Sequence, residues 1–130
     1  MEYLTDLSYE IRGAAMDVYN ELGPGLLESV YEKAMVCELG LRDIPVVTQV
    51  PVEITYKGMI IGNDLRIDLL AEDTVVIELK SVEEVKKVHI KQLRTYLQLL
   101  NKPVGWLFNF GEGDFADGMI KVVNRYFHQD

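Results

Sequence analysis

The chain of 130 residues has few cysteines, few basic residues and no long apolar run. Its one cysteine, Cys37, excludes an internal disulfide and is typical of a small core residue in a reducing compartment. No run is long enough to span a bilayer, and the N-terminus lacks the basic flank and apolar core of a secretory signal. Repeats and low-complexity stretches are also absent. With 48% hydrophobic residues, the sequence predicts a single cytoplasmic domain over residues 1–130, without membrane contact.

Basic residues are scarce but unevenly distributed. The chain has 13 Lys and Arg against 21 Asp and Glu, a net charge of −8, which opposes non-specific binding to a polyanion. Residues 1–40 hold eight acids and two bases, whereas residues 80–102 hold two acids and six bases. Any nucleic-acid surface is therefore expected in the second of these segments.

Charged side chains interrupt two neighbouring apolar segments. Residues 66–70 and 75–80 have the composition of short buried strands. Asp68 lies in the first segment, and Glu78 and Lys80 lie in the second. A charge removed from water must be paired or bound to a metal, so charges at these positions lower stability and point to chemistry.

The register of these two strands determines whether the charges meet. Side chains alternate between the faces of a strand, so Glu78 and Lys80 share one face, as Arg66 and Asp68 do. We place the centre of a hairpin at Asp73. Asp68 then lies opposite Glu78, and by the same register Arg66 lies opposite Lys80. One face of this hairpin is then entirely aliphatic and the other is charged. A two-residue turn would move Asp68 to the aliphatic face, so the sequence predicts a turn of odd length or a bulge.

Two carboxylates and an ammonium group suit a metal-dependent reaction on phosphate. Carboxylate oxygens are ligands of Mg²⁺ or Mn²⁺, which usually keep waters and share a substrate phosphate. A lysine beside them can hold a water or stabilise charge that develops on phosphorus. The alternative is a structural ion pair in which Lys80 neutralises Glu78 or Asp68. The hairpin by itself favours neither interpretation.

A helix is predicted after the second strand, over residues 83–100, and residues 81–84 have the Ser-x-x-Glu form of a capping box. At 3.6 residues per turn, His89, Gln92 and Tyr96 form a stripe on a face that is otherwise apolar. Taken alone, Tyr96 is typical of a core tyrosine with a satisfied hydroxyl. His89 is interpreted as a partly buried supporting residue rather than a metal ligand.

A second helix, predicted over residues 25–39, contains another candidate carboxylate. It follows the helix-breaking sequence at residues 22–25. Glu28 lies in its first turn, where interaction with the helix dipole explains a glutamate without any site. Its alignment with an apolar stripe that includes Tyr31 aims it inward, and this favours a ligand role.

The order of these motifs resembles the PD-(D/E)XK nuclease superfamily. Asp68 followed by Glu78-Leu79-Lys80 is similar to the motif that names it, although Ile67 stands where that name has proline. Gln92 followed by Tyr96 is similar to the Gln-xxx-Tyr motif of one branch.

The earlier helix strengthens the resemblance. Residues 25–31 match the Gly-xx-Glu-xx-Tyr signature of the small GxxExxY proteins in that superfamily, through Gly25, Glu28 and Tyr31. The resemblance extends from about residue 6 to about residue 127, nearly the whole chain. It implies hydrolysis of phosphodiester bonds, expected in DNA, by an enzyme that uses Mg²⁺ or Mn²⁺.

The resemblance also implies roles for single residues. Lys80 would orient or activate the water, and Gln92 and Tyr96 would steady the site or contact the nucleic-acid backbone. The acidic residues around the metal would be Glu28, Asp68 and Glu78.

Three bases on the predicted helix over residues 83–100 lie beside the stripe that contains Gln92 and Tyr96. They are Lys87, Lys91 and Arg94. A solvated helix face is the commoner reason for such a run. The functional interpretation is a short phosphate track that leads to the metal. Because the track is small, it predicts weak binding unless a homodimer or a partner protein helps.

Two other functions remain open at this point. The acidic composition also fits a catalytically idle nucleic-acid or protein binding module that retains the nuclease fold. A metal-dependent hydrolase of a small phosphorylated molecule would fit the acidity better, and it would need an enclosed pocket.

The predicted fold is α/β, a restriction-endonuclease-like three-layer sandwich with a mixed central sheet flanked by helices. A helix between two apolar strands suggests a parallel crossover. Residues 120–127 fit either a strand or a helix. The predicted helices cover residues 5–22, 25–39 and 83–100, and the predicted strands cover residues 46–56, 60–71, 74–80 and 104–110. A tight turn at Lys57-Gly58 is predicted between the first two of these strands.

Overall fold

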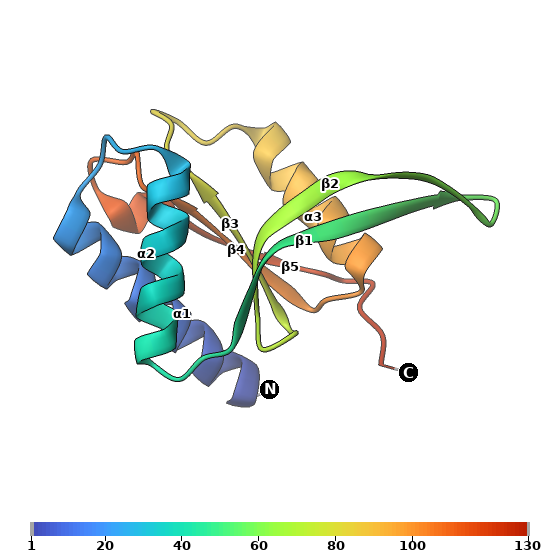
Figure 1. Ribbon diagram of the computed structural model, residues 1–130, viewed down its shortest axis with the longest axis horizontal. Coiled ribbons are helices and arrows are strands. Elements are labelled where there is room, and N and C mark those ends of the chain that lie inside the picture. Colours follow the sequence, from blue (N-terminus) through green and yellow to red (C-terminus); the bar gives the residue numbers. More distant parts are fainter. Residues whose placement is uncertain (1, 130) are drawn as a thin grey trace.

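The computed structural model describes residues 2–129, which form a five-stranded sheet with helices on both faces (Figure 1). Among these residues, no helix combines the length and the apolar composition that crossing a membrane requires. The elements in chain order are α1 (Glu2–Leu22), α2 (Glu28–Leu41), β1 (Val46–Tyr56), β2 (Met59–Ala71), β3 (Val75–Lys80), α3 (Lys87–Leu100), β4 (Val104–Asn109), the short 3-10 helix η1 (Phe115–Gly118) and β5 (Met119–Val123).

The sheet has the strand order β1-β2-β3-β4-β5, with β3 parallel to β4 and the other neighbours antiparallel. Helices α1 and α2 cover one face, and α3, which connects the parallel strands, covers the other (Figure 1). On β3, Ile77 and Leu79 pack in the cluster with α1 and α2, whereas Val76 packs in the cluster with α3. The predicted three-layer sandwich with a mixed sheet and a parallel crossover is confirmed. The ambiguous segment 120–127 contributes most of β5.

The β2–β3 hairpin has the predicted register. Ala71 pairs with Val75 and Leu69 pairs with Ile77, which leaves a turn of three residues centred on Asp73. Glu72 and Asp73 take φ values of 48° and 53°, in the left-handed region that tight turns require. Extending the register by one residue places Asp68 opposite Glu78.

The pleat of the first hairpin changes face close to Asp68. Alternation places Ile67 and Leu69 on one face, but Ile67 packs in the α3 cluster and Leu69 in the opposite cluster. Gln49 of β1 has a φ of 52° at the same level of the hairpin, between the pairs Thr48–Leu69 and Val50–Ile67. The faces of β2 thus change between Ile67 and Leu69, so the prediction that one face of the hairpin carrying Asp68 and Glu78 is entirely aliphatic is wrong.

Helix α2 begins at Glu28, three residues later than predicted. Gly23 and Gly25 have φ values of +68° and +105°, which no α-helical residue adopts, so a loop precedes the helix. Cys37 is exposed, and its prediction as a core residue is wrong. The helical period explains this, because the stripe that enters the core is Tyr31, Met35 and Leu39.

Helix α3 begins at Lys87, four residues later than predicted, and the expected capping box does not form. The Ser81 hydroxyl donates instead to the carbonyl of Leu26 at 2.6 Å. The helix is capped by His89, whose Nδ1 accepts a hydrogen bond from the N–H of Lys86 at 3.0 Å. A tertiary contact of Ser81 thus replaces the local cap that its sequence suggests.

Strands β1 and β2 extend past the rest of the sheet as a two-stranded arm (Figure 1). Its tip is the tight turn predicted at Lys57-Gly58, where both residues have positive φ, 50° and 82°. Apolar side chains near the tip are not covered by the body of the domain, and the core begins at Val52. Four apolar side chains next to this turn are between 56% and 64% exposed: Tyr56, Met59, Ile60 and Ile61.

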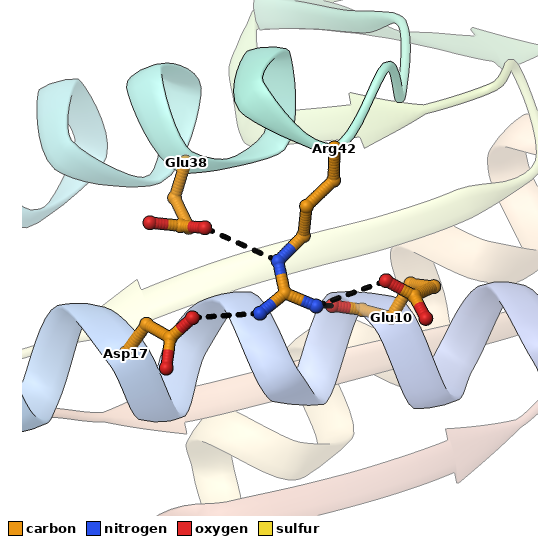
Figure 2. Close-up of polar contacts among 4 residues, drawn as sticks. All are labelled: Glu10, Asp17, Glu38 and Arg42. Carbon is orange, nitrogen blue, oxygen red and sulfur yellow. Dashed lines mark hydrogen bonds and ion pairs between the residues drawn. The ribbon is translucent and has the colours of Figure 1, made fainter.

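The Arg42 guanidinium joins α1 and α2 through three carboxylates (Figure 2). Nη1 lies 2.9 Å from Glu10, Nη2 lies 2.7 Å from Asp17, and Nε lies 3.2 Å from Glu38. The side chain lies over Gly13, where an added Cβ would be 2.8 Å from Nη1. Glycine at this position therefore leaves room for the guanidinium between two acids of α1.

We expect Arg42→Met to lower the free energy of unfolding by about 1 kcal/mol, because it removes partly exposed ion pairs and keeps most of the apolar stem. Urea denaturation at low salt measures the change. Lys33→Met, at an exposed position of α2, is the control and should change stability by less than about 0.5 kcal/mol. The expectation fails if both variants lose the same amount, or if about 1 M sodium chloride leaves the difference intact.

Candidate active site

Asp68 and Glu78 meet where the β2–β3 ladder opens. The paired residues end at Leu69 and Ile77, one position before the two carboxylates. Here Asp68 Oδ2 accepts a hydrogen bond from the N–H of Leu79 at 2.8 Å. The Asp68 carboxylate thus takes the place of a backbone acceptor and lies beside the last residues of β3.

The Glu78 side chain is the most perturbed ionisable group at this position. The residue is 8% exposed, and its Oε1 is buried without a hydrogen-bond partner among residues 2–129. Burial, followed by the negative charge of Asp68, raises the pKa of Glu78 from 4.5 to about 9, while Lys80 opposes the shift. A buried oxygen without a partner is unfavourable, so this carboxylate is ready to take a proton or a cation.

Lys80 and Tyr96 share the electrostatic environment of the two carboxylates. Lys80 is partly exposed at the end of β3, and its charge favours the ionised form of Glu78. Tyr96 of α3 is 5% exposed, and burial together with the charges of Glu78 and Asp68 raises the pKa of its hydroxyl. The fold therefore brings four of the predicted site residues together, from two strands and the helix that follows them.

Gln92 lies at the surface of α3, unlike Tyr96. The predicted buried stripe of His89, Gln92 and Tyr96 is only partly correct, because the buried residues of α3 are Leu93, Tyr96 and Leu97. Leu93 rather than Gln92 packs in the cluster beneath the helix. Gln92 lies one turn from Tyr96 on the solvent side, and His89 serves the helix cap.

The Gly-xx-Glu-xx-Tyr segment shapes the loop beside β3. The Tyr31 hydroxyl donates to the carbonyl of Gly23 and accepts a hydrogen bond from the N–H of Leu26 at 3.2 Å. Its ring stacks on Phe110 with centroids 4.3 Å apart. The carbonyl of Leu26 in turn accepts the Ser81 hydroxyl. Tyr31 is therefore a buried anchor that holds this loop against the residue following β3.

Glu28 is the exposed first residue of α2. Within residues 2–129, no three His, Cys, Asp or Glu side chains form a group that could hold a metal. The structure accordingly does not place Glu28 with Asp68 and Glu78 in a three-carboxylate cluster. Its position in the first turn agrees with the explanation from the helix dipole.

Asn109, at the end of β4, is a structural residue that sequence reasoning missed. It is fully buried, and its Oδ1 accepts the N–H groups of Val82 and Gly111, both at 3.0 Å. Its Nδ2 donates to the carbonyl of Val82 at 2.9 Å. These bonds position the segment between β3 and α3. The only signal in the sequence was a polar residue inside the apolar run 104–110.

The three predicted nucleic-acid contacts lie on the exposed side of α3. Lys87, Lys91 and Arg94 are all exposed, and their spacing places them in one line along the helix. The line begins at the first turn of the helix, directly after the segment that Asn109 holds. It therefore starts shortly after Lys80 in the chain.

The donors present fit a hard divalent cation. Asp68 and Glu78 supply carboxylate oxygens, the ligands that Mg²⁺ and Mn²⁺ prefer, and Glu78 Oε1 has no competing partner in the described chain. Two carboxylates are enough for ions that usually keep waters and bind substrate phosphate. Because Glu78 must be deprotonated to act as a ligand, cation binding would release a proton.

Gly111→Ala should destabilise the protein by about 2 kcal/mol or more, because its Cβ would lie 2.1 Å from the carbonyl oxygen of Val82 and force two backbone segments apart. Thermal unfolding measures the loss. Gly113→Ala is the matched control, since a Cβ there meets nothing within 4 Å. Similar melting temperatures for the two variants would contradict the packing at Gly111.

The metal-free protein is expected to lose stability as the pH rises between about 5 and 8. Glu78 holds a proton up to a pKa of about 9 in the folded chain and releases it near 4.5 in the unfolded chain. The folded state therefore binds more protons within this window, and the free energy of unfolding falls by about 1 kcal/mol per pH unit. Denaturation in EDTA at several pH values measures this slope, which should be smaller in Glu78→Gln than in the wild type. Parallel pH profiles of wild type and Glu78→Gln would refute it.

A sequence model described as the PD-(D/E)XK nuclease superfamily matches residues 5–122. No curated protein and no solved structure matches the chain significantly. The matched range contains Asp68, Glu78 and Lys80 and almost all of the mixed sheet that presents them. Nucleases of this superfamily generally use divalent metals, which agrees with the donor set. On this evidence the chain belongs to the PD-(D/E)XK nuclease superfamily.

Proposed function

We propose that the protein is a Mg²⁺- or Mn²⁺-dependent nuclease that hydrolyses phosphodiester bonds in DNA, and that it belongs to the GxxExxY branch. The observation that carries the proposal is the buried Glu78 carboxylate, which has an oxygen without a partner and lies beside Asp68 and Lys80. An ion pair alone would not leave that oxygen unsatisfied. A structural role for the group is therefore the weaker explanation.

Each residue of the group has a defined task in this reaction. Asp68 and Glu78 would hold the cation. When bound, such an ion polarises the scissile phosphate and lowers the pKa of a coordinated water. Lys80 places a positive charge next to Glu78, where it can orient the attacking water and stabilise charge on the phosphoryl oxygens.

Tyr96 and Gln92 would position the substrate. The Tyr96 hydroxyl keeps its proton because its pKa is raised, so it can donate a hydrogen bond to a phosphate oxygen. Gln92, exposed one turn away, can reach the same backbone from the solvent side. Lys87, Lys91 and Arg94 extend the phosphate contacts along α3. Because these contacts are few, a homodimer or a partner protein is part of the proposal.

We expect wild-type protein to cleave at least one of single-stranded, duplex and branched DNA in Mg²⁺ or Mn²⁺, and to lose cleavage in EDTA. Asp68→Ala and Lys80→Ala should each reduce the rate about 100-fold or more, because each removes an interaction with the reacting phosphate or its cation. Gel assays with labelled strands measure this, and RNA in parallel tests the choice of nucleic acid.

Two controls make this experiment decisive. Asp64→Ala removes an exposed carboxylate from the same strand as Asp68, and Lys33→Ala removes an exposed lysine far from β3 in sequence. Both should cleave at the wild-type rate. Cleavage by Asp68→Ala at the wild-type rate would show that the activity does not come from this site.

The acidic net charge of −8 favours a second candidate, a catalytically idle nucleic-acid or protein binding module that retains the fold. Binding of DNA without cleavage under any metal condition would support it. A hydrolase of small phosphorylated molecules has less support. Two clefts formed by residues 2–129, of about 440 and 640 Å³, are lined by residues other than Asp68, Glu78 and Lys80.

A further inference from the structure

A basic cleft lies between α3, β5 and the turn that follows β5. It has a volume of about 440 Å³, in the range that holds a single small ligand or one nucleotide. The side chains that give it its chemistry are Arg94, Gln98, Lys121, Arg125 and Tyr126. None of them belongs to the group around Glu78.

The cleft concentrates positive charge that nothing in the described chain neutralises. Arg94, Lys121 and Arg125 line it, no Asp or Glu of residues 2–129 does, and these three cations make no ion pair or hydrogen bond with any of those residues. This is unusual in a chain with 21 acids and 13 bases. By contrast, Arg42 contacts three carboxylates. Like charges that converge without a counter-charge repel one another, so an anionic ligand would stabilise the arrangement.

The cleft continues the line of bases on α3. Lys87, Lys91, Arg94 and Gln98 follow the spacing i, i+4, i+7 and i+11, which places them in one row along the helix, and all are exposed. The row starts at the first turn of α3 and enters the cleft through Arg94 and Gln98. A polyanion bound along this row would therefore reach the cleft.

The wall formed by Arg125 and Tyr126 is held in place by a buried side chain. Asn124 is 5% exposed, and its Nδ2 donates to the carbonyls of Leu97 and Lys102 at 3.1 and 3.0 Å. Its Oδ1 accepts the N–H of Tyr126 at 2.9 Å. The turn is thus tied to the C-terminal end of α3, which fixes the backbone of both residues before any ligand arrives.

Tyr126 adds an aromatic surface to the cations. It is 73% exposed, although a tyrosine of this size gains stability from burial. Aromatic rings beside a basic groove bind single-stranded nucleic acid, because every base has a face that can stack while the cations contact phosphates. In a duplex the bases are already stacked on each other and have no free face.

We propose that this cleft binds one nucleotide of an unpaired nucleic-acid strand, with its phosphate between Arg94, Lys121 and Arg125 and its base against Tyr126. The inference rests on the proposed nuclease function, since it assigns a substrate strand to the same protein. It adds that the substrate has a single-stranded segment, which leaves the active site along α3.

Equilibrium binding without cleavage tests the proposal. Fluorescence anisotropy of a labelled oligodeoxythymidine strand in EDTA gives the affinity of the full chain, and a duplex of equal length is the comparison. Lys121→Ala and Arg125→Ala should each weaken binding about threefold or more and reduce the salt slope by about 0.7, as loss of one phosphate contact does. Tyr126→Ala should weaken binding to the single strand about fivefold or more, with an unchanged salt slope and no effect on duplex.

Matched variants separate the cleft from general surface effects. Lys33→Ala removes an exposed base from α2, and Tyr9→Ala removes a tyrosine that is 70% exposed on α1. Both should bind like wild type, and Tyr126→Phe, which keeps the ring, should as well. Equal affinities of wild type, Arg125→Ala and Tyr126→Ala would overturn the proposal, as would equal losses in the α1 and α2 controls.

The two proposals fail in different ways. A protein that binds the strand through the cleft but cleaves nothing in Mg²⁺ or Mn²⁺ refutes the nuclease function and supports the cleft. A protein that cleaves DNA while Lys121→Ala, Arg125→Ala and Tyr126→Ala bind and cleave like wild type supports the nuclease and refutes the cleft.

Discussion

The pairing of β2 with β3 around a three-residue turn is the constraint on which the candidate site depends. It places Asp68 opposite Glu78 and directs both toward the helix that follows. A shift of one residue would send Asp68 to the other face of the sheet. The left-handed conformations of Glu72 and Asp73 are unfavourable for residues with side chains. Lys102 helps to hold them, because its Nζ contacts the carbonyl and the carboxylate of Asp73 at 2.8 and 3.0 Å.

This register also explains why a buried acid is tolerated. Glu78 lies on a strand whose other residues are almost all buried and apolar, between β2 and β4. Its burial lowers stability as soon as the side chain ionises, and the surrounding sheet must supply the difference. Natural proteins depart from good local design mainly where function requires it. A carboxylate with an unsatisfied oxygen, in the middle of a well-packed sheet, is such a departure.

The net charge of −8 is not spread evenly over the surface of this protein. Acids dominate α1 and α2, where Arg42 contacts three of them, while the bases gather along α3 and in the cleft beside β5. The sheet lies between α1 and α2 on one face and α3 on the other (Figure 1). Salt at about 0.1 M largely screens the interaction between exposed charges that are more than about 10 Å apart. A polyanion near α3 would therefore respond mainly to the bases close to it. An acidic protein can therefore carry a surface suited to nucleic acid.

The sequence by itself determined the features that depend on neighbours along the chain. Strand alternation and turn chemistry act over a few residues, so β1, the Lys57-Gly58 turn and the pairing of Asp68 with Glu78 were predictable. Only the tertiary structure decided the depth of each side chain and the partners of each polar group. Asn109 bonds to the backbone of Val82 after β3, and Ser81 donates to the carbonyl of Leu26 instead of capping a helix. The partners of both residues are distant in sequence and come near only when the layers of the fold pack together.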